Sequence, residues 1–558
     1  MKHSMTRRTA LAMSAAGALK GQGVAQTKWQ PSAEMVEAHD RYIDSRLKSQ
    51  TTTQSHRFYG GFPDADGLVH GGASGGALHT FGLGYILPRS RHYKSPLMLE
   101  RMRLVREYLN NHTSIDGNVD LLITNFNSPP DTAFLVWAIG QIACLARRFG
   151  ASDVEKLLEP VLKRCGTALT KGGIHTPNHR WVTSSALAQL NELYPDPSYE
   201  KRINQWLAEG IDIDSDGQYT ERSTGGYNGI TNRALTILAV KLRKPELLQF
   251  VRRNLESMLY LLHPGEEVVT DISRRQDLYT AGTMAGYALA LKYLAVKDHN
   301  GILQTLARRF PASLGDALEY EELQQTGPAP EPIPDDYVKE FPFLKIGRVR
   351  RGKKSATLVL DGRSRFFGVR NGLAVVEAVR FSSLFFGKAQ FRPQRCWRAG
   401  DVAGRPSWVL EQSMDAPYYQ PLEPAEKVGT EDWEESRKQR RRTEMNYLTY
   451  RVTVVETAGG FTLKFEAEGP KDLPVMIELA LRPGGQLEGA EKHPRVEGCH
   501  LLRSGRATYT VGADAIKFGP GIALHEAITG RGIEAKLPGP TVFMTGYAPF
   551  THVITIEA

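Results

Sequence analysis

The spacing of the apolar residues changes near the middle of the chain, and this change constrains the fold more than any other feature. From about residue 34 to residue 310, apolar residues recur every three or four positions, as in residues 131–149, where they form one broad face. Beyond about residue 340, apolar and polar residues alternate, as in residues 448–456. A helical region followed by an alternating region predicts an α+β protein of two domains, with stacked helical hairpins first and a large antiparallel β-sandwich second.

The predicted elements are short and numerous in both halves. Asp131 is a candidate N-cap for the helix over 131–149. Further helices are expected over residues 154–169, 181–193, 199–210, 229–242, 245–262, 278–296 and 301–310. Strands are expected over residues 357–360, 366–370, 374–381, 383–391, 475–481, 507–511 and 553–556, with a hairpin that turns at Ala458-Gly459-Gly460. Helical hairpins in this number build either a solenoid or a closed toroid.

The domain boundaries follow from composition. Residues 327–336 are rich in proline and acidic residues and form the best linker candidate in the chain. We therefore predict an export signal over 1–26, a helical domain over 27–320, a linker over 321–341 and a β-sandwich over 342–558.

The N-terminus has the pattern of a twin-arginine export signal. Arg7-Arg8 precedes a modestly apolar stretch and then small residues that end near Ala25. We therefore expect a periplasmic or secreted protein; an ordinary basic terminus is the alternative. The formal net charge falls from +9 to +5 without residues 1–26, which contain four Lys or Arg and no acidic residue.

Charge and composition exclude several partners. A mildly basic chain suits an anionic substrate, but no nucleic-acid-binding module is visible and no apolar run of about 20 residues could span a membrane. The basic run at residues 437–442 is flanked by acidic residues, which favours a solvated loop. Cys144 and Cys165 lie in helical patterns and are expected to be small buried residues. The oligomeric state stays open.

Three short connections of the helical half concentrate polar residues, and each lies on a loop or at a helix start. They are residues 174–181, 214–228 and 271–277. Loops on a helical scaffold carry function, and helix N-termini favour anions. A carboxylated ligand is therefore expected at these connections.

The residue types suit proton abstraction next to a carboxylate. That carboxylate must first be neutralised, and Asn178, His179 or an arginine can donate the hydrogen bonds. Tyr227 could act as the base in its phenolate form and then protonate the leaving oxygen, with Arg222 or a neighbouring arginine stabilising its negative charge. Each residue also has a structural interpretation: Asn178 as a helix cap, His179 as a structural histidine with its hydrogen bonds made within the fold, and Tyr227 as a core residue.

Two other motifs carry less weight. Asp214-Ser215-Asp216-Gly217 could be a bare turn or the start of a calcium loop, but it lacks the later acidic ligand of an EF-hand. Gly72-Ala73-Ser74-Gly75-Gly76 fits the pattern of a serine-hydrolase nucleophile elbow, yet no strand precedes it. We expect a glycine-rich turn or cleft loop there, with His79 nearby. No metal and no cofactor are predicted.

The arrangement of these residues resembles that of the heparinase II/III-like polysaccharide lyases and related alginate lyases. Asn178-His179 starts a helix, and Asp216-Gly217, Glu221, Ser223 and Tyr227-Asn228 follow in the order of the family pattern. The resemblance implies an incomplete α/α toroid followed by an antiparallel β-sandwich. It also implies β-elimination of a uronic-acid polysaccharide, with Asn178 neutralising the carboxylate, His179 assisting and Tyr227 as the acid. Whether Tyr227 is also the base stays open at this point.

The chain departs from the family pattern at three places. Asn228 stands where the family has a histidine, one additional residue separates Ser223 from Tyr227, and residues 379–391 lack the β-domain histidine. A further donor is therefore sought among Arg380, Lys388 and Gln390. We predict catalytic roles for Asn178, His179, Tyr227 and Arg222, and substrate contacts from His175, Tyr219, Glu221, Asn228, Arg274, Arg275, His79, Lys388 and Gln390.

Two other functions fit the same scaffold. A glycoside hydrolase would need two carboxylates facing the sugar across about 5–10 Å. The candidates are Asp216, Glu221, Asp271 and Asp277. A non-catalytic glycan-binding protein is the third possibility, because a fold does not determine a function.

Overall fold

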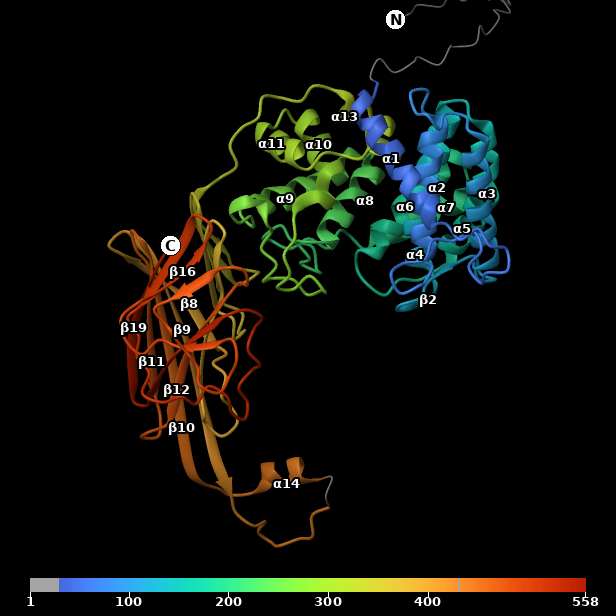
Figure 1. The fold of residues 1–558 in the computed structure, drawn as a ribbon. Helices are drawn as coiled ribbons and strands as arrows, with labels where there is room; N and C mark the ends of the chain where they lie inside the picture. Colours follow the sequence, from blue (N-terminus) through green and yellow to red (C-terminus); the bar gives the residue numbers. More distant parts are fainter. Residues whose placement is uncertain (1–29, 430–431) are drawn as a thin grey trace, which may run out of the picture.

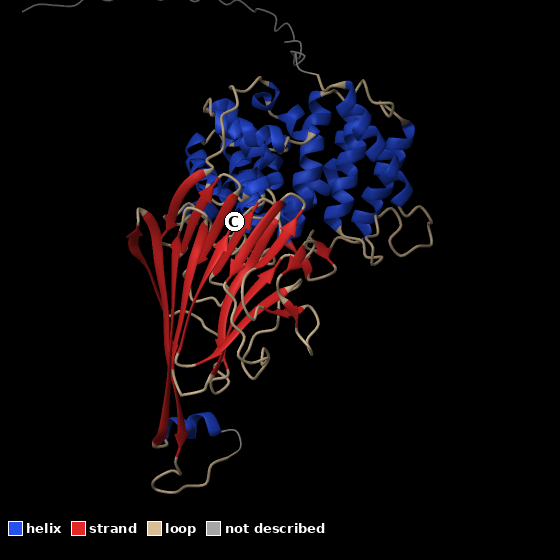
Figure 2. Cartoon of the chain, turned by 60° about the vertical axis from the view of Figure 1, so that its left-hand side comes forward, coloured by secondary structure: helices blue, strands red, loops and turns tan. Residues whose placement is uncertain are grey.

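The computed structural model describes residues 30–429 and 432–558, so the expected export signal lies outside the described residues. Helices make up the first half of this region and strands the second (Figures 1 and 2). The predicted fold class, a helical toroid followed by an antiparallel β-sandwich, is confirmed. Within the described residues, no helix combines the length and the apolar character needed to cross a bilayer.

The helical domain consists of hairpins of one outer and one inner helix. The outer helices are α1 (Ala33–Ser49), α3 (Pro96–Asn111), α5 (Ser152–Lys171), α7 (Pro197–Ala208), α9 (Leu248–Leu259) and α11 (Gly301–Arg309). The inner helices are α2 (Gly71–Ile86), α4 (Pro129–Arg148), α6 (His179–Leu193), α8 (Tyr227–Lys241) and α10 (Ala288–Lys297). Three 3₁₀ turns, η1 (Pro245–Leu247), η2 (Pro264–Glu266) and η3 (Met284–Tyr287), complete the set. Successive inner helices pack side by side, from α2 through α4, α6 and α8 to α10.

One turn recurs where the chain passes from an outer to an inner helix. Seven-residue turns closed by single β-bridges run over residues 63–69, 113–119, 213–219 and 262–268. In the third turn, Oδ1 of Asp214 accepts hydrogen bonds from the backbone N–H groups of Asp216 and Gln218 at 3.0 and 2.9 Å, and Gly217 has a φ of +85°. Asp64 makes the same two hydrogen bonds in the first turn. Each turn is therefore stabilised by its own residues.

A short segment closes the gap between the last hairpin and the first ones. Helices α12 (Leu314–Glu319) and α13 (Glu321–Gln324) follow α11; α12 packs on α4 and α13 packs on α10. Gln141 of α4 donates to Asp316 at 3.0 Å and to Glu319 at 2.7 Å, and both carboxylates are buried. The segment therefore joins the two ends of the toroid.

The second domain is a sandwich of two large sheets (Figure 2). The nine-stranded sheet has the order β14-β15-β18-β12-β7-β6-β5-β4-β3, and the eight-stranded sheet has the order β13-β16-β17-β19-β11-β10-β9-β8. All neighbours are antiparallel except β15 and β18. The bounds of the first sheet are β3 (Asp336–Phe341), β4 (Ile346–Arg351), β5 (Lys354–Val359), β6 (Phe367–Asn371), β7 (Ala374–Ser383), β12 (Pro474–Leu481), β14 (Glu491–Lys492), β15 (Cys499–Leu501) and β18 (Thr541–Tyr547). The bounds of the second sheet are β8 (Arg395–Val402), β9 (Arg405–Tyr419), β10 (Arg442–Glu456), β11 (Gly460–Glu468), β13 (Gln486–Glu488), β16 (Ala507–Val511), β17 (Asp514–Gly519) and β19 (Phe550–Glu557). Two further strands, β1 (Val119–Leu121) and β2 (Asn125–Ser128), pair with each other within the helical domain.

The two domains share a buried junction. Phe341, Leu344 and Ile346 belong to the apolar core of the helical domain. The fully buried Arg348 of β4 donates to the carbonyl oxygens of Tyr260 and Leu262 at 3.2 and 3.0 Å. The nine-stranded sheet therefore packs against the ends of the helices, and its loops lie beside the loops of the toroid.

Several predicted elements differ from the observed ones. The expected linker over 321–341 contains α13 and β3, because Phe341 is needed in the core. The glycine-rich motif at 72–76 lies inside α2: a Cβ atom at Gly75 would lie 2.4 Å from the side chain of Leu135, so glycine permits close helix packing. No strand forms over 384–391, whereas the basic run begins in α14 (Trp433–Gln439). Ser128, and not Asp131, is the N-cap of α4.

Candidate active site

The three polar connections predicted to carry function lie close together at the N-terminal ends of the inner helices. The connection before α8 is joined to residues 269–277 by three hydrogen bonds. The backbone N–H of Arg274 donates to the carbonyl of Glu221 at 3.1 Å, and that of Gly225 donates to Asp277 Oδ2 at 3.0 Å. The hydroxyl of Thr224 donates to the carbonyl of Val269 at 2.6 Å. These hydrogen bonds hold the two loops as one unit.

The Asp216-Gly217 pair of the motif is a structural element. Oδ2 of Asp216 accepts the backbone N–H groups of Phe343 and Leu344 at 2.8 and 2.9 Å, which ties the turn to the β-domain. A Cβ atom at Gly217 would lie 2.6 Å from the carbonyl oxygen of Arg253, and its φ of +85° favours glycine. The turn thus positions the residues that follow it.

Asn178 is the N-cap residue of α6, but its side chain forms no capping hydrogen bond. Its Nδ2 donates to Glu221 Oε2 at 2.5 Å and to Thr176 Oγ1 at 3.2 Å. Its Oδ1 is buried and has no hydrogen-bond partner among the described residues. Asn178 therefore faces the loop before α8, and it is not the structural cap that one interpretation expected.

Glu221 connects Asn178 to the basic loop. Its second oxygen, Oε1, lies 3.4 Å from Nε of Arg275. Burial raises the pKa of Glu221, although the hydrogen bond from Asn178 and the charge of Arg275 act in the opposite direction. Glu221 therefore holds an amide and a guanidinium group in place from one position.

His179 is the first residue of α6 and is largely buried. Burial, aided by His175 and Arg275, lowers its pKa to about 4, so the imidazole is neutral near pH 7. Its ring centroid lies 4.7 Å from that of the exposed His175 and 6.3 Å from that of Phe134. In the part of the chain that the structure describes, Nδ1 has no hydrogen-bond partner. A neutral ring with a free nitrogen can accept or donate a proton.

Tyr227 is the first residue of α8, and its side chain is partly exposed. The guanidinium carbon of Arg275 lies 4.9 Å from the centroid of its ring. Its hydroxyl lies 3.5 Å from Gln276 Oε1, and the helix start is capped by Ser223 Oγ, which accepts the N–H of Tyr227 at 2.9 Å. The phenol is therefore open to solvent and beside a cation.

These contacts form one continuous series from Asn178 through Glu221 and Arg275 to Tyr227, with His179 next to Asn178 in the chain. The structure thus brings the loop of Asn178 and the loop of Tyr227 together beside the side chain of Arg275. The N-termini of α6 and α8 both point their free backbone N–H groups to this end, which favours an anionic ligand.

Three predicted site residues point away from the group formed by Asn178, His179, Glu221, Arg275 and Tyr227. Arg222 is buried with a φ of +51°, and its guanidinium lies over the ring of Phe343, so it joins the two domains. The hydroxyl of Tyr219 donates to Asn232 at 2.7 Å inside the core. Asn228 is fully buried and donates to Gln218 at 2.6 Å. Their positions do not agree with the predicted catalytic role of Arg222 or with substrate contact by the other two.

The remaining predicted contacts are divided between several places. Arg274 is exposed beside the group, whereas His79 lies deeper in the toroid, where it contacts Gln141 at 2.8 Å. In the β-domain, Lys388 pairs with Asp415 on the surface. The amide of Gln390 bonds to the backbone of Phe381 and of Glu534, so its polar atoms serve the fold. The structure does not bring Lys388 or Gln390 to the group.

Sequence reasoning missed the part of the β-domain that meets these loops. Arg363 donates to the carbonyl oxygen of Asp271, and the guanidinium carbon of Arg365 lies 3.8 Å from the ring centroid of Tyr279. Gln276, which contacts Tyr227, was within a recognised loop but was not singled out. No spacing in the sequence relates residues 363–365 to residues 271–279, so only the domain packing could reveal them.

Among the described residues, no group of three or more His, Cys, Asp or Glu side chains is arranged to hold a metal ion.

Comparisons with known proteins agree on the architecture. No family model matches the sequence, and no curated protein matches it significantly. Solved structures similar to it include a xanthan lyase from Paenibacillus, with 10% identity and a TM-score of 0.55, and a chondroitin AC lyase from Streptomyces coelicolor in complex with chondroitin sulphate, with 12% identity and a TM-score of 0.53. The match with the xanthan lyase covers 87% of this chain and only 51% of that protein, so the chain spans about half its length. The match with the chondroitin AC lyase covers 96% of this chain and 80% of that protein. The toroid-and-sandwich fold is thus one found in polysaccharide lyases.

Proposed function

We propose that this chain is a polysaccharide lyase that cleaves a uronic-acid-containing glycan by β-elimination. The observation that carries the proposal is the series of contacts from Asn178 through Glu221 and Arg275 to Tyr227, at the helix N-termini of a fold found in polysaccharide lyases. The export expected from residues 1–26 is part of the same proposal, since a polymer substrate is met outside the cytoplasm.

The reaction requires one proton to leave and one proton to be supplied. A base removes the proton on the carbon next to the uronate carboxylate, and the electron pair of that bond forms a carbon–carbon double bond. The bond to the glycosidic oxygen breaks, and that oxygen takes up a proton. Tyr227 is placed to perform both proton transfers, because its phenol is accessible and the guanidinium of Arg275 lies over its ring.

The negative charge that develops on the uronate carboxylate needs hydrogen-bond donors. Arg275 provides a permanent positive charge beside Tyr227. The amide protons of Asn178 are shared between Thr176 and Glu221, so its participation requires one of those hydrogen bonds to be exchanged for one to the substrate. Glu221 acts as a positioning residue for both groups. Donors held in place before the substrate arrives need little reorganisation during the reaction.

His179 supplies a neutral imidazole next to Asn178. Because its pKa is lowered to about 4, it does not add a positive charge at neutral pH, but its free ring nitrogen can exchange a proton. It is therefore the second candidate for the base, with Tyr227 then acting as the acid alone.

Three of the four carboxylates considered for a glycoside hydrolase are engaged in structural contacts. Asp216 binds two backbone N–H groups of the β-domain, Asp277 binds Gly225 and Ser273, and Glu221 binds Asn178. No observation favours hydrolysis over elimination.

The test is a screen of the purified protein against alginate, hyaluronan, heparan sulfate, glucuronan and rhamnogalacturonan. Elimination creates a conjugated double bond that absorbs in the near ultraviolet, whereas hydrolysis creates reducing ends without that absorbance. We expect ultraviolet-absorbing products from at least one polymer and none with Tyr227→Phe. Reducing ends without absorbance, or an undiminished rate in Tyr227→Phe, would contradict the proposal.

A further inference from the structure

An open cavity of about 560 Å³ lies along the axis of the toroid, next to the candidate active site. Its walls come from the inner helices α2, α4 and α8 and from residues 285–289, and residues 311–316 of the closing segment complete it. Phe134, in its wall, contacts the ring of His179. The volume is within the range of about 300–1,000 Å³ that ligand pockets occupy.

The cavity extends inward from the reaction site. Phe134 and Ile230 lie one turn or so inside the starts of α4 and α8, while Gln141 and Arg233 lie one to two turns deeper. At 1.5 Å per residue, the seven residues from Phe134 to Gln141 correspond to a depth of about 10 Å. Because Phe134 contacts the ring of His179, the shallow end of the cavity adjoins the candidate active site.

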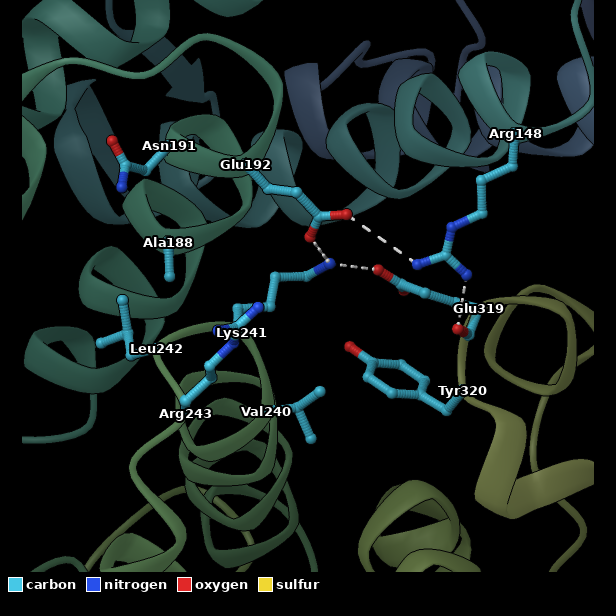
Figure 3. Close-up of a pocket in the computed structure, with 10 residues that line it drawn as sticks. All are labelled: Arg148, Ala188, Asn191, Glu192, Val240, Lys241, Leu242, Arg243, Glu319 and Tyr320. Carbon is cyan, nitrogen blue, oxygen red and sulfur yellow. Dashed lines mark hydrogen bonds and ion pairs between the residues drawn. The ribbon is translucent and has the colours of Figure 1, made fainter. Parts of the chain in front are cut away.

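The closing segment separates this cavity from the opposite end of the toroid. Asp316 lines the axial cavity, whereas Glu319 and Tyr320 line a second cavity at the C-terminal ends of α4, α6 and α8 (Figure 3). All residues from 315 to 320 are buried. Figure 3 shows the ammonium group of Lys241 between the carboxylates of Glu192 and Glu319, at 2.5 and 2.6 Å. A glycan chain therefore has no continuous path through the toroid.

The deep wall of the cavity is polar but carries no net charge. Arg233 donates to both oxygens of Asp316 at 2.8 Å. Burial opposes the charge of Asp316, but Arg233 outweighs it and lowers the pKa of that carboxyl to about 2. Burial lowers the pKa of His79, so the ring that contacts Gln141 is neutral near pH 7. The side walls contain the rings of Phe134 and Trp137, which suit the apolar face of a sugar ring.

Gly76 leaves space beside the helix backbone in the wall of the cavity. It lies within helix α2 and lines the cavity, and a Cβ atom built on it would meet nothing within 4 Å. A larger side chain at position 76 would therefore extend into the cavity without first displacing a neighbouring protein atom.

We propose that the axial cavity binds the terminal, uncharged sugar of a glycan, next to the uronate at the reaction site, so that cleavage takes place at chain ends. This inference rests on the proposed lyase function for the cleavage step, but the binding of a neutral sugar stands apart from it. A neutral, hydroxyl-bearing sugar matches a wall of paired charges, and a cavity closed at its inner end excludes the middle of a polymer.

The first experiment measures binding without turnover. Glucose, galactose, mannose, rhamnose, N-acetylglucosamine and glucuronate are each mixed with the protein, and ligand-detected saturation-transfer NMR is recorded. We expect a signal from at least one neutral sugar with the wild type, and its loss in Gly76→Leu, which fills open space. The control Ala38→Leu adds the same kind of bulk at an exposed position of α1 and should keep the signal. Gly76→Ala is the milder variant in case Gly76→Leu does not fold.

The second experiment measures product sizes from whichever polymer the wild type degrades. End cleavage releases small products while the viscosity of the polymer falls slowly, and Gly76→Leu should lower kcat/KM by about tenfold or more. A rapid fall in viscosity, or turnover that does not depend on residue 76, would overturn the inference while leaving the lyase function intact.

If no polymer is eliminated, the proposed function fails and the NMR result alone decides on the cavity. A neutral-sugar signal that Gly76→Leu removes supports the cavity site. No such signal, or equal binding of glucuronate, rejects it.

Discussion

The two ends of the toroid are built from similar residues but in different ways. At the end where the inner helices begin, Asn178, His179 and Glu221 each have a buried polar atom without a hydrogen-bond partner among the described residues. At the opposite end the hydroxyl of Tyr320 is likewise without a partner among the described residues, but the charged groups are paired: Lys241 contacts two carboxylates, and Arg148 donates to the carbonyl oxygen of Glu319 at 2.7 Å (Figure 3).

The difference indicates what each end does. A buried polar atom without a partner costs free energy, so a fold retains a group of them where a ligand supplies the missing hydrogen bonds. A paired network instead holds elements together, and Lys241 links α8 to the closing segment. We therefore expect substitutions at the first end to reduce activity with little loss of stability, and substitutions at the second end to do the reverse.

The largest effect is expected at Tyr227. Tyr227→Phe should lower kcat by about 10²–10⁴-fold, because it removes a group that transfers a proton in the reaction. The free energy of unfolding should change little, since the single hydrogen-bond contact of the hydroxyl within the described part of the chain is the one with Gln276 at 3.5 Å. Steady-state rates on the polymer found in the screen and urea denaturation check both parts. A large loss of stability would remove the contrast between the two ends.

Lys241→Met should have the next largest effect, this time on stability. It leaves the carboxylate of Glu319 buried without its ion pair, which costs about 3–5 kcal/mol in the free energy of unfolding. Glu192→Gln is the control, because Glu192 is 41% exposed and its pair with Lys241 contributes about 1 kcal/mol or less. Denaturation curves measure both variants, and activity of the folded Lys241→Met protein should be retained. Equal losses of stability in the two variants would show that the buried pair with Glu319 contributes no more than the exposed pair with Glu192.

The third prediction concerns pH. The pKa of His179 is about 4 in the folded protein and about 6.5 in the unfolded chain, so between these values only the unfolded chain binds the proton. Stability should therefore fall by about 2–3 kcal/mol as the pH decreases from about 6.5 to about 4. His179→Gln should remove that part of the decrease, measured as the difference between the two proteins in urea denaturation at several pH values. If the free energy of unfolding depends on pH in the same way in the wild type and in His179→Gln, the imidazole of His179 is protonated as readily in the folded protein as in the unfolded chain.

The smallest effect is expected where the active-site turn meets the β-domain. Asp216→Ala removes the acceptor of two backbone N–H groups and should cost about 1–2 kcal/mol in stability. Because the same turn positions Glu221, activity should also fall. Asp216→Ala should thus change both stability and activity, whereas each variant at either end of the toroid changes mainly one of the two. Ser215→Ala, one residue earlier and exposed, is the control and should change neither. Activity and thermal denaturation of the two variants are the measurements. Unchanged activity in Asp216→Ala would show that the contact of Asp216 with the β-domain does not position the active site.

Much of the fold could be predicted from the sequence because the spacing of apolar residues follows directly from helix and strand geometry. The helices α4 to α8 and the hairpin β10–β11 match their predicted ranges closely. Helix α2 was missed because its glycines suggest a loop. Several of them are required for close packing, as at Gly82, where a Cβ atom would lie 2.3 Å from the side chain of Ile142. Such a contact depends on a residue 60 positions away and leaves no local pattern.

The candidate site was predictable where it depends on one loop, and less so where it depends on several. Asn178, His179 and Tyr227 stand in recognisable motifs at helix starts. Arg222 belongs to the same motif, yet Phe343 draws its guanidinium toward the β-domain. The axial cavity involves Gly76, Trp137 and Arg233 from three helices, and no spacing in the sequence relates them.

The recurring seven-residue turn has a consequence for how such a protein can change. Since each turn closes on itself, as residues 213–219 do, the turn can be kept while the connection that follows it changes, provided that the neighbouring loop to which the connection is hydrogen-bonded changes with it. Grafting the connections of one toroid onto the turns of another is therefore a practical route to enzymes with new sugar preferences, and natural diversification has the same route open to it.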